Sequence, residues 1–269
     1  MPDPSASKTR PPATRLAWRV RRLLTRKYLD GALDRLRFRL DTSPRSVSWL
    51  RWLPLPEIHA GAYHDLPWVG IDSGRRGDGS GARLEVMKPV LSELGVTSAV
   101  DIGSSVGWFT FTLTELGIPT VGVERDPRAL RSALYVRSRA KLNDASFVVA
   151  DLTKDNLRAV PHADCFLVLS IWHHWVREFG LADATAIVEG LWAMSSKVLF
   201  FDTGENEMPA SWNLPAMLPD PDTWLATYLT ETCTGSTVRN LGRFDALGPN
   251  NEPCQRSLLA VVRARAASD

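Results

Sequence analysis

The stretch LVLSIWHHWVREFG, residues 167–180, contains the side chains best suited to acid–base chemistry. His173 and His174 are adjacent, and they follow an apolar run typical of a buried strand. An imidazole titrates near neutrality, so it can accept the proton of a hydroxyl group at physiological pH. Trp172 and Trp175 flank the pair, and histidines packed among tryptophans are also compatible with a purely structural role. The two interpretations differ in what the chain must place around the pair.

Three acidic residues each end a short apolar segment upstream of the histidines. They are Asp101 in AVDIGSSVG, Glu124 in TVGVE and Asp151 in ASFVVAD. Because the carboxyl ends of parallel strands meet at one edge of a sheet, these acids are expected to converge there. The second acid is then placed to accept hydrogen bonds from both ribose hydroxyls of an adenosine ligand, and the third from the adenine amino group. The alternative is that the acids cap the helices that follow.

Gly103 and Gly107 follow Asp101 in the pattern D-x-G-x-x-x-G. Glycines let a strand turn sharply into a helix, and they let a ligand approach the positive end of the helix dipole. The spacing differs from the G-x-G-x-x-G of dinucleotide-binding proteins, which disfavours an NAD-dependent dehydrogenase. A glycine-rich turn is common scaffolding on its own, so the predicted adenosine site depends on Glu124 and Asp151 as well.

Short apolar strands alternate with helical segments over most of the chain, from about residue 84 onward. This alternation predicts an α/β domain whose parallel sheet is covered by helices on both faces. The predicted strands are residues 97–103, 120–124, 145–151, 164–170 and 197–203, with a closing pair at 236–244 and 256–266. The predicted helices are residues 84–95, 108–117, 127–143 and 181–195.

The N-terminal part of the chain differs in composition from this domain. Residues 1–14 are rich in Pro, Ser and Thr, which predicts a disordered leader. Residues 15–81 form a basic helical and irregular N-terminal extension, and residues 1–60 contain 13 Lys/Arg against 5 Asp/Glu. The amphipathic helix predicted within residues 15–40 is compatible with contact to an anionic membrane surface. It is equally compatible with a helix packed on the domain with its charged face in water.

Composition excludes several classes of protein. No window reaches the roughly 18 uninterrupted apolar residues of a membrane-spanning helix, and no apolar run typical of a secretory signal follows the first basic residues. Cys165, Cys233 and Cys254 lie far apart without a CxxC pair, which favours reduced thiols over a disulfide or zinc framework. We therefore expect a cytoplasmic protein, peripheral at the inner face of the membrane if the basic helix binds lipid.

The segments VDIGSSVG, VGVERD, VVADL and DCFLVLS together resemble the motifs of the class I S-adenosylmethionine (SAM)-dependent methyltransferase superfamily. The resemblance covers roughly residues 84–264, and it marks residues 82–269 as the SAM-dependent methyltransferase domain. It implies a Rossmann-like, doubly wound, seven-stranded sheet, mostly parallel, with a C-terminal antiparallel hairpin. It also implies the cofactor SAM and, by position, these cofactor-binding residues: Asp101, Gly103, Ser104, Gly107, Glu124, Asp151, Leu152 and Ser170. The chain has GSSVG where many members have GCGTG.

The same resemblance places the end of the fourth strand beside the methyl group of the cofactor. His173 and His174 are then candidate catalytic bases for methylation of a hydroxyl, with His174 preferred. A second interpretation joins the two histidines to Asp202, at the end of the fifth strand, as ligands of a divalent metal ion that lowers the pKa of the acceptor hydroxyl. In a third, one imidazole only packs or orders the loop.

Other side chains near the predicted strand ends are candidates for contact with the acceptor. Glu205 and Glu207 follow the fifth strand in DTGENE. Indole rings stack well on sugars and aromatic acceptors, although core packing is the commoner role of a single tryptophan. The tryptophans on or after the strand ends are Trp172, Trp175, Trp212 and Trp224.

The string LSIWHHWVREFG is similar to the corresponding stretch of bacterial methyltransferases that modify polysaccharide or O-antigen chains, and more loosely to that of RNA 5′-phosphate methyltransferases. The resemblance therefore implies O-methylation of a sugar or glycan. The alternatives are an O-methyltransferase of another small metabolite or natural product, an RNA methyltransferase, and a SAM-binding scaffold or regulator without turnover. A net acidic domain without a recognised RNA-binding module argues against a nucleic-acid partner.

Overall fold

The computed structural model describes residues 66–69, 79–249 and 252–264. These residues all lie in the compact unit Glu57–Asp269. The leader at residues 1–14 and the basic helix at 15–40 lie outside the described residues, so membrane contact through that helix stays a prediction. In the part of the chain that is described, no helix is both long and apolar enough to cross a bilayer.

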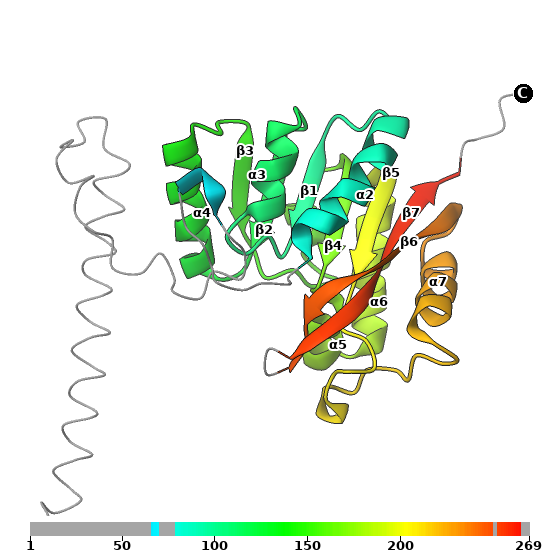
Figure 1. The fold of residues 1–269 in the computed structure, drawn as a ribbon. Helices are drawn as coiled ribbons and strands as arrows, with labels where there is room; N and C mark the ends of the chain where they lie inside the picture. The colour runs from blue at the N-terminus through cyan, green and yellow to red at the C-terminus, as the bar shows by residue number, and fades with distance from the viewer. Residues whose placement is uncertain (1–65, 70–78, 250–251, 265–269) are drawn as a thin grey trace, which may run out of the picture. The chain divides into compact units, whose positions relative to one another are not determined.

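Seven strands form one sheet in the order β3-β2-β1-β4-β5-β7-β6 (Figure 1). Strands β1 to β5 pair in parallel, whereas β7 is antiparallel to both β5 and β6. Their bounds are β1 (Ala99–Ile102), β2 (Thr120–Glu124), β3 (Ala145–Val149), β4 (Ala163–Leu169), β5 (Ser195–Asp202), β6 (Ser236–Leu247) and β7 (Pro253–Arg263). The predicted seven-stranded, mostly parallel sheet with its C-terminal antiparallel hairpin is confirmed. The strand order reverses between β1 and β4, where sheets of this class bind their ligands.

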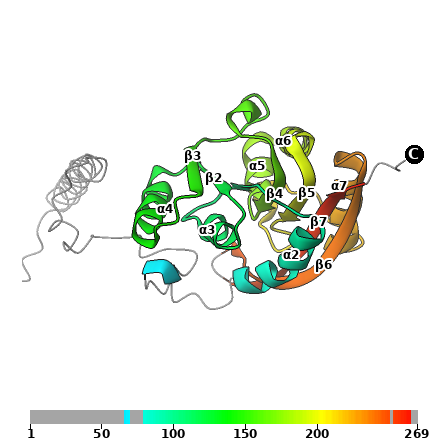
Figure 2. The ribbon, with the colours of Figure 1, turned by 90° about the horizontal axis from the view of Figure 1, so that it is seen from above.

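Helices cover both faces of the sheet, α2 and α3 on one side and α5 and α6 on the other (Figure 2). The helices are α2 (Ser80–Glu93), α3 (Trp108–Glu115), α4 (Pro127–Ala140), α5 (Trp172–Phe179), α6 (Leu181–Met194) and α7 (Pro221–Thr232). Short 3₁₀ turns are η2 (Pro67–Val69), η3 (Leu157–Ala159) and η4 (Ala210–Trp212). The two-sided cover explains the buried apolar runs within the central strands, residues 165–168 in β4 and 198–201 in β5.

Strand β4 shows how one sequence fills two cores. Phe166 and Val168 point to the face covered by α5, α6 and α7, whereas Cys165 and Leu167 point to the face covered by α2 and α3. All four side chains are fully buried. Because side chains alternate along a strand, an uninterrupted apolar run supplies both layers. Cys165 is thus a buried side chain of the core.

Two helices were not expected from the sequence, and a third begins earlier than predicted. Helices α5 and α7 follow the strand end at Ser170 and the long loop after β5. Asp220 caps α7 by accepting the backbone N–H of Thr223 at 2.9 Å, and Pro221 occupies the first turn. Helix α2 starts four residues before the predicted Leu84, and Pro89 lies inside it.

Packing against the sheet domain begins before the predicted boundary at residue 82. Leu66 is fully buried in a cluster that includes Val106 and Phe111. The indole of Trp68 packs edge-on against Phe111, and its Nε1–H donates to Glu115 at 2.7 Å. Residues 66–69 therefore pack on α3 and α4, although the sequence placed them in the N-terminal extension.

Candidate cofactor-binding and active site

The turn after β1 approaches β2 closely and then opens helix α3. The backbone N–H groups of Gly103 and Ser104 both donate to the carbonyl of Val123, at 2.8 and 3.0 Å. Gly107 has a φ of +87°, and a Cβ atom there would lie 2.9 Å from the rings of Phe111 and Phe147. Glycine is required at this position by both conformation and space. The turn places the N-terminus of α3 at the carboxyl edge of the sheet.

Asp101 stabilises this turn by joining strand β1 to helix α3. Its carboxylate is buried, and Oδ2 accepts hydrogen bonds from the backbone N–H of Thr110 at 3.1 Å and from its Oγ1 at 2.8 Å. The side chain of Ser104 is also buried, packed against Gly122, and its hydroxyl has no hydrogen-bond partner among the described residues. Of the predicted cofactor residues, these two are buried beneath the turn and shape it.

Glu124 is the acid best placed to hold a ribose. Its Oε2 accepts the backbone N–H of Ser105 at 2.8 Å, and its Oε1 accepts that of Asp126 at 2.7 Å. The side chain is half-buried at the end of β2. Each carboxylate oxygen has a second lone pair, so the group can accept two further hydrogen bonds while two amides fix its orientation. The residues present therefore fit the ribose of an adenosine cofactor.

Asp151 lies beside Glu124 at the end of β3, since Glu124 pairs with Val149 in the sheet. Its exposed carboxylate lies 3.6 Å from Nη1 of Arg125, and the same nitrogen donates to Glu178 at 2.7 Å. Hydrogen bonding to Glu178 and the nearby Asp151 charge raise the pKa of Arg125, although burial opposes the shift. Arg125 thus links Asp151, at the end of β3, to Glu178 on helix α5. The sequence analysis missed this contact.

Leu152, the second residue predicted to contact adenine, is buried in the core that packs under α5 and α6. Its side chain therefore packs in the core beneath the end of β3, next to Asp151. The polar groups offered to a base at this position come from Asp151 and the backbone.

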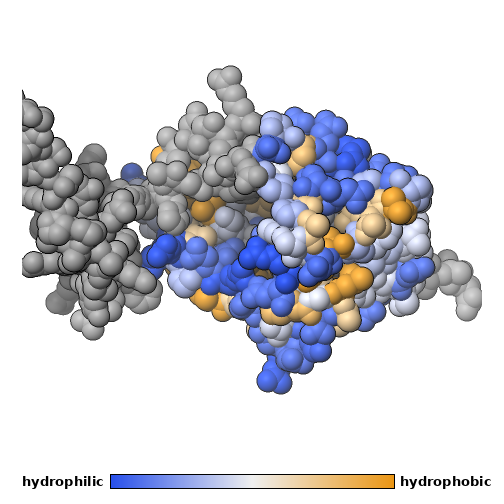
Figure 3. All heavy atoms as spheres, turned by 90° about the horizontal axis from the view of Figure 1, so that it is seen from below, coloured by the Kyte–Doolittle hydropathy of each residue, from blue (hydrophilic) through white to orange (hydrophobic). Residues whose placement is uncertain are grey.

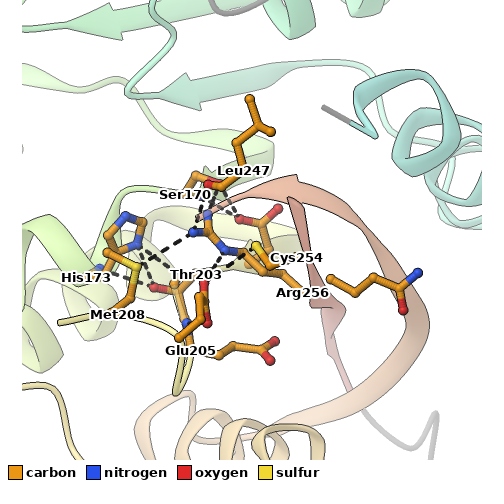
Figure 4. A network of polar contacts seen from close by, with 12 residues as sticks. Ser170, His173, Thr203, Glu205, Met208, Leu247, Cys254 and Arg256 are labelled. Atoms are coloured by element: carbon orange, nitrogen blue, oxygen red, sulfur yellow. Dashed lines mark hydrogen bonds and ion pairs between the residues drawn. The ribbon is translucent and has the colours of Figure 1, made fainter. Parts of the chain in front are cut away.

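The end of β4 is fixed by a buried ionic network (Figure 4). Ser170 has a φ of +54°, and its backbone N–H and hydroxyl donate to Oδ1 of Asp202 at 2.6 and 2.9 Å. The Nε of Arg83 lies 2.9 Å from Oδ2 of the same carboxylate, and both side chains are buried. Nη1 of Arg256 reaches the Ser170 hydroxyl at 3.4 Å. The left-handed backbone of a serine is strained, and these contacts hold it in place.

Arg256 enters this network from β7 and is only 3% exposed. Its Nε donates to Oε1 of Glu207 at 2.9 Å, and Nη2 donates to the carbonyl of Leu247 at 3.2 Å. Glu205 is also buried, accepting from Ser257 and Arg243. The suggestion that Glu205 and Glu207 contact the acceptor is therefore corrected: their carboxylates are occupied in tying the loop after β5 to the hairpin.

His173 is buried with its Nδ1 already occupied. The backbone N–H of Gly204 donates to Nδ1 at 2.9 Å, and Oγ1 of Thr203 lies 3.0 Å from the same atom. Since an N–H can only donate, Nδ1 is the acceptor and the proton of the neutral ring is on Nε2. Burial holds the pKa of His173 well below its usual value, and the nearby His174 and Arg256 lower it further. His173 is a neutral side chain that anchors the loop after β5.

His174 has a different environment, although its ring lies only 4.4 Å from that of His173. It is half-buried, and no described residue makes a hydrogen bond to its imidazole. Burial lowers the pKa of His174, and so do the charges of Arg125, Arg177 and Arg256, while Glu178 opposes them. At neutral pH the ring is therefore uncharged, with a lone pair available to take a proton. Of the two histidines, His174 has the properties of a general base.

Comparison with known proteins gives structural matches only. No family model and no curated protein matches the sequence. The bifunctional kinase-methyltransferase WbdD matches with a TM-score of 0.61 and 22% sequence identity, over 80% of this chain and 45% of that chain. Magnesium protoporphyrin IX methyltransferase (ChlM) from Synechocystis PCC 6803, with bound SAM, matches with a TM-score of 0.50 and 17% identity, over 68% of this chain and 80% of that chain. This chain has the fold of the SAM-dependent methyltransferases.

The fold predicted from the four motifs is thereby confirmed. The alignment spans less than half the length of the WbdD chain. In a methyltransferase fold, the turn at Gly103, the acid Glu124 and the strand end at Ser170 all lie along one edge, which points downward in Figure 1. Seen from that edge, hydrophilic and apolar residues lie side by side on the surface (Figure 3).

The residues proposed as metal ligands do not fit a metal ion. Both oxygens of Asp202 are occupied, Oδ1 by Ser170 and Oδ2 by Arg83, and Nδ1 of His173 accepts from the backbone. Arg83 and Arg256 also bring positive charge next to the carboxylate. Among the described residues, no three His, Cys, Asp or Glu side chains are grouped so that they could hold a metal. We derive no step through a metal.

The four tryptophans near the strand ends have different roles. Trp172 and Trp175 are buried in the core, and Trp224 stacks on Tyr228 with ring centroids 5.2 Å apart. Trp212, on η4, is half-buried and packs against both histidines. Core packing explains the first three, and Trp212 is the tryptophan of this set that lies at the candidate active site.

Sequence reasoning missed the arginines of this site. Arg83, Arg125 and Arg256 come from α2, the β2–α4 turn and β7. Arg125 could have been found, since it follows the ribose acid directly. Arg256 carried a weaker signal, an arginine at the start of the apolar run of the last strand. Nothing in the local pattern around Arg83 indicates its contact with Asp202.

Proposed function

We propose that this chain is a SAM-dependent methyltransferase that transfers a methyl group to a hydroxyl of a sugar or glycan. The observation that carries the proposal is the pairing of two groups along one sheet edge. Glu124 is fixed by two amides and keeps lone pairs for a ribose, and the imidazole of His174 has a lowered pKa and no hydrogen bond to any described residue. The first fits cofactor binding, and the second fits removal of a proton.

When bound, SAM supplies an electrophilic methyl group on its sulfonium. Glu124 holds the ribose end of the crevice, and the turn at Gly103 lets the backbone approach the ligand closely. The strained Ser170, fixed by Asp202, sets the position of the strand end between the two ligands. Most of the rate of such a displacement comes from holding the reacting atoms in line at attack distance.

The protein must also remove the acceptor's proton. His174 would accept the hydroxyl proton on a ring nitrogen while the acceptor oxygen takes the methyl carbon from sulfur, which would leave with the S–C bonding pair as the neutral thioether. The imidazolium would then release the proton to water. His173 cannot replace it through Nδ1, because the N–H of Gly204 occupies that lone pair. The loop after β5 is instead held by His173 against helix α5.

A sugar or glycan hydroxyl is the acceptor that the surroundings of His174 favour. The half-buried indole of Trp212 lies beside the imidazole, with ring centroids 5.3 Å apart. Indoles present a flat apolar face with a polar edge, which suits the stacking of a sugar ring. We infer that this acceptor is presented to the carboxyl edge of the sheet, opposite the cofactor.

Calorimetry tests the cofactor part of the proposal. S-adenosylhomocysteine (SAH) and SAM should bind the whole chain, and NAD should not. A SAM-binding protein without turnover would show the same affinities but no transfer of labelled methyl to any alcohol. Binding of NAD with no binding of SAM or SAH would overturn the proposal.

A further inference from the structure

The loop after β5 is closed at its base and presents one tryptophan at its tip. Nδ2 of Asn206 donates to the carbonyl of Met217 at 3.2 Å, and the N–H of Met217 donates to Oδ1 of Asn206 at 3.1 Å. Met217 is fully buried, and Glu205 anchors the chain just before the loop. Loops whose ends are fixed in this way are compact and frequently functional. The 3₁₀ turn η4 at the tip carries Trp212.

Trp212 contacts three side chains of helix α5. The ring of His173 stacks on it at 5.7 Å and 23°, and that of His174 lies 5.3 Å away. The guanidinium carbon of Arg177 lies 4.6 Å from the indole centroid, a cation–π contact. Because residues one turn apart share a face of a helix, the three side chains form a continuous surface under the indole.

Three polar groups at this surface have no hydrogen-bond partner in the described part of the chain. They are the Nε1–H of Trp212, the guanidinium of Arg177 and the imidazole of His174. Arg177 pairs with no described carboxylate, in contrast to Arg125 and Arg256. Trp212 and His174 are half-buried and Arg177 is exposed, so these groups are open to a ligand. A few convergent polar groups beside an aromatic ring are typical of a small-molecule site, and three such groups suit a ligand with several hydroxyls.

We propose that Trp212, Arg177 and His174 form the acceptor subsite for a pyranose ring. The ring's C–H face contacts the indole, neighbouring hydroxyls accept hydrogen bonds from Arg177 and the indole N–H, and the hydroxyl to be methylated reaches His174. This inference rests on the proposed function and names its acceptor-positioning residues. A planar aromatic alcohol would use the indole but would offer Arg177 and the indole N–H fewer hydroxyl acceptors than a pyranose does.

Binding of simple pyranosides tests the subsite without knowledge of the natural acceptor. Saturation-transfer NMR is measured with methyl α-D-glucopyranoside, methyl α-D-mannopyranoside and methyl α-D-galactopyranoside, in the presence of SAH. At least one should receive saturation at its ring protons from the wild-type chain. In Trp212→Ala the affinity should fall roughly tenfold, and Trp212→Phe should restore part of it. Arg177→Gln should weaken binding as well.

Ser211→Ala is the matched control, since Ser211 is an exposed neighbour on the same loop. It should bind the pyranoside as the wild type does. The proposal is overturned if no pyranoside binds, if Trp212→Ala binds as well as Ser211→Ala, or if catechol binds better than every pyranoside. Calorimetry with SAH on each variant distinguishes failure of the subsite from failure of the proposed function. If the wild type does not bind SAH, the methyltransferase function is rejected. If SAH binds but no pyranoside does, only the subsite is rejected.

Discussion

The two halves of the sheet edge are built in different ways. On the side of β1, β2 and β3, Glu124 is fixed by the backbone amides of Asp126, two residues away, and of Ser105, 19 residues away in the turn after β1. On the side of β4, β5 and β7, Ser170 is fixed by Asp202 and by Arg256, which lies 86 residues away. The first half uses backbone donors and leaves its acid open to a ligand. The second half neutralises its charges internally and leaves His174 as its open group.

Under the proposed function, the half around Glu124 binds the cofactor and the half around His174 binds the acceptor. They are called the cofactor half and the acceptor half. A cofactor that many reactions share can be held by a short motif, whereas an acceptor needs a surface assembled from several distant elements. If this is right, substitutions in one half should leave the function of the other nearly unchanged.

His174→Ala should have the largest effect, and it should affect methyl transfer but not cofactor binding. Without the imidazole, the hydroxyl proton has no positioned acceptor, so kcat for methyl transfer should fall about 10² to 10⁴-fold. The affinity for SAH, measured by calorimetry, should not change, because no cofactor contact is removed. Wild-type turnover in this variant would show that His174 is not the base.

Arg256→Met tests whether the acceptor half depends on its buried ionic network. The substitution leaves Glu207 without its arginine, whereas Asp202 keeps Arg83, and removing one partner of a buried pair costs about 3 kcal/mol of unfolding free energy. Urea denaturation measures the loss. The double variant Arg256→Met/Glu207→Gln should regain part of it, because one unpaired charge is removed. Equal stability of the wild type and Arg256→Met would contradict this account of the network.

Glu124→Ala should weaken the cofactor half alone. A hydrogen bond to a charged group contributes about 1.5 to 3 kcal/mol, so loss of even one ribose contact should reduce SAH affinity by at least roughly tenfold. At saturating SAM, kcat should stay near that of the wild type. Asp144→Asn serves as the control, since Asp144 is an exposed acid that precedes the first residue of β3 and so lies at the opposite edge of the sheet from Glu124. A decrease of the same size in both variants would rule out a specific ribose contact.

The smallest effect is expected in the pH dependence of stability. Burial keeps the pKa of His173 well below 6.5 in the folded state, so the unfolded chain binds a proton that the folded chain does not. The free energy of unfolding should therefore fall as pH decreases below about 6.5, by up to about 1.4 kcal/mol per pH unit. Denaturation at pH 7.5 and 5.5 should show a shallower dependence in His173→Gln. An unchanged slope would contradict the assignment.

The cofactor half could be predicted from the sequence because its signals are local. The segment TVGVE is strand β2 at both ends, and Asp126–Pro127 opens α4 as its cap pattern indicates. Helix α7 begins with the same pattern, Asp220–Pro221, and that signal was overlooked. Pro89 lies inside α2 and does not end that helix.

The acceptor half could be located but not assembled from the sequence. The position of His173 and His174 after β4 followed from the strand pattern. Their different roles did not, because the hydrogen bond from Gly204 to His173 joins two loops whose approach depends on the packed fold. Asp202 was predicted as a possible metal ligand for the same reason. Its ion pair with Arg83 on α2 depends on the packed fold and cannot be seen in the local sequence.

Transfer of tritium-labelled methyl from SAM by the whole chain tests the central claim most directly. The wild type is incubated with methyl pyranosides, small aromatic alcohols and RNA, and the labelled product is separated and counted. The account predicts label in at least one pyranoside as a methyl ether, at a rate that His174→Ala reduces at least about 100-fold. Label that enters RNA or an aromatic alcohol but no sugar would contradict it, and so would equal rates in the wild type and His174→Ala.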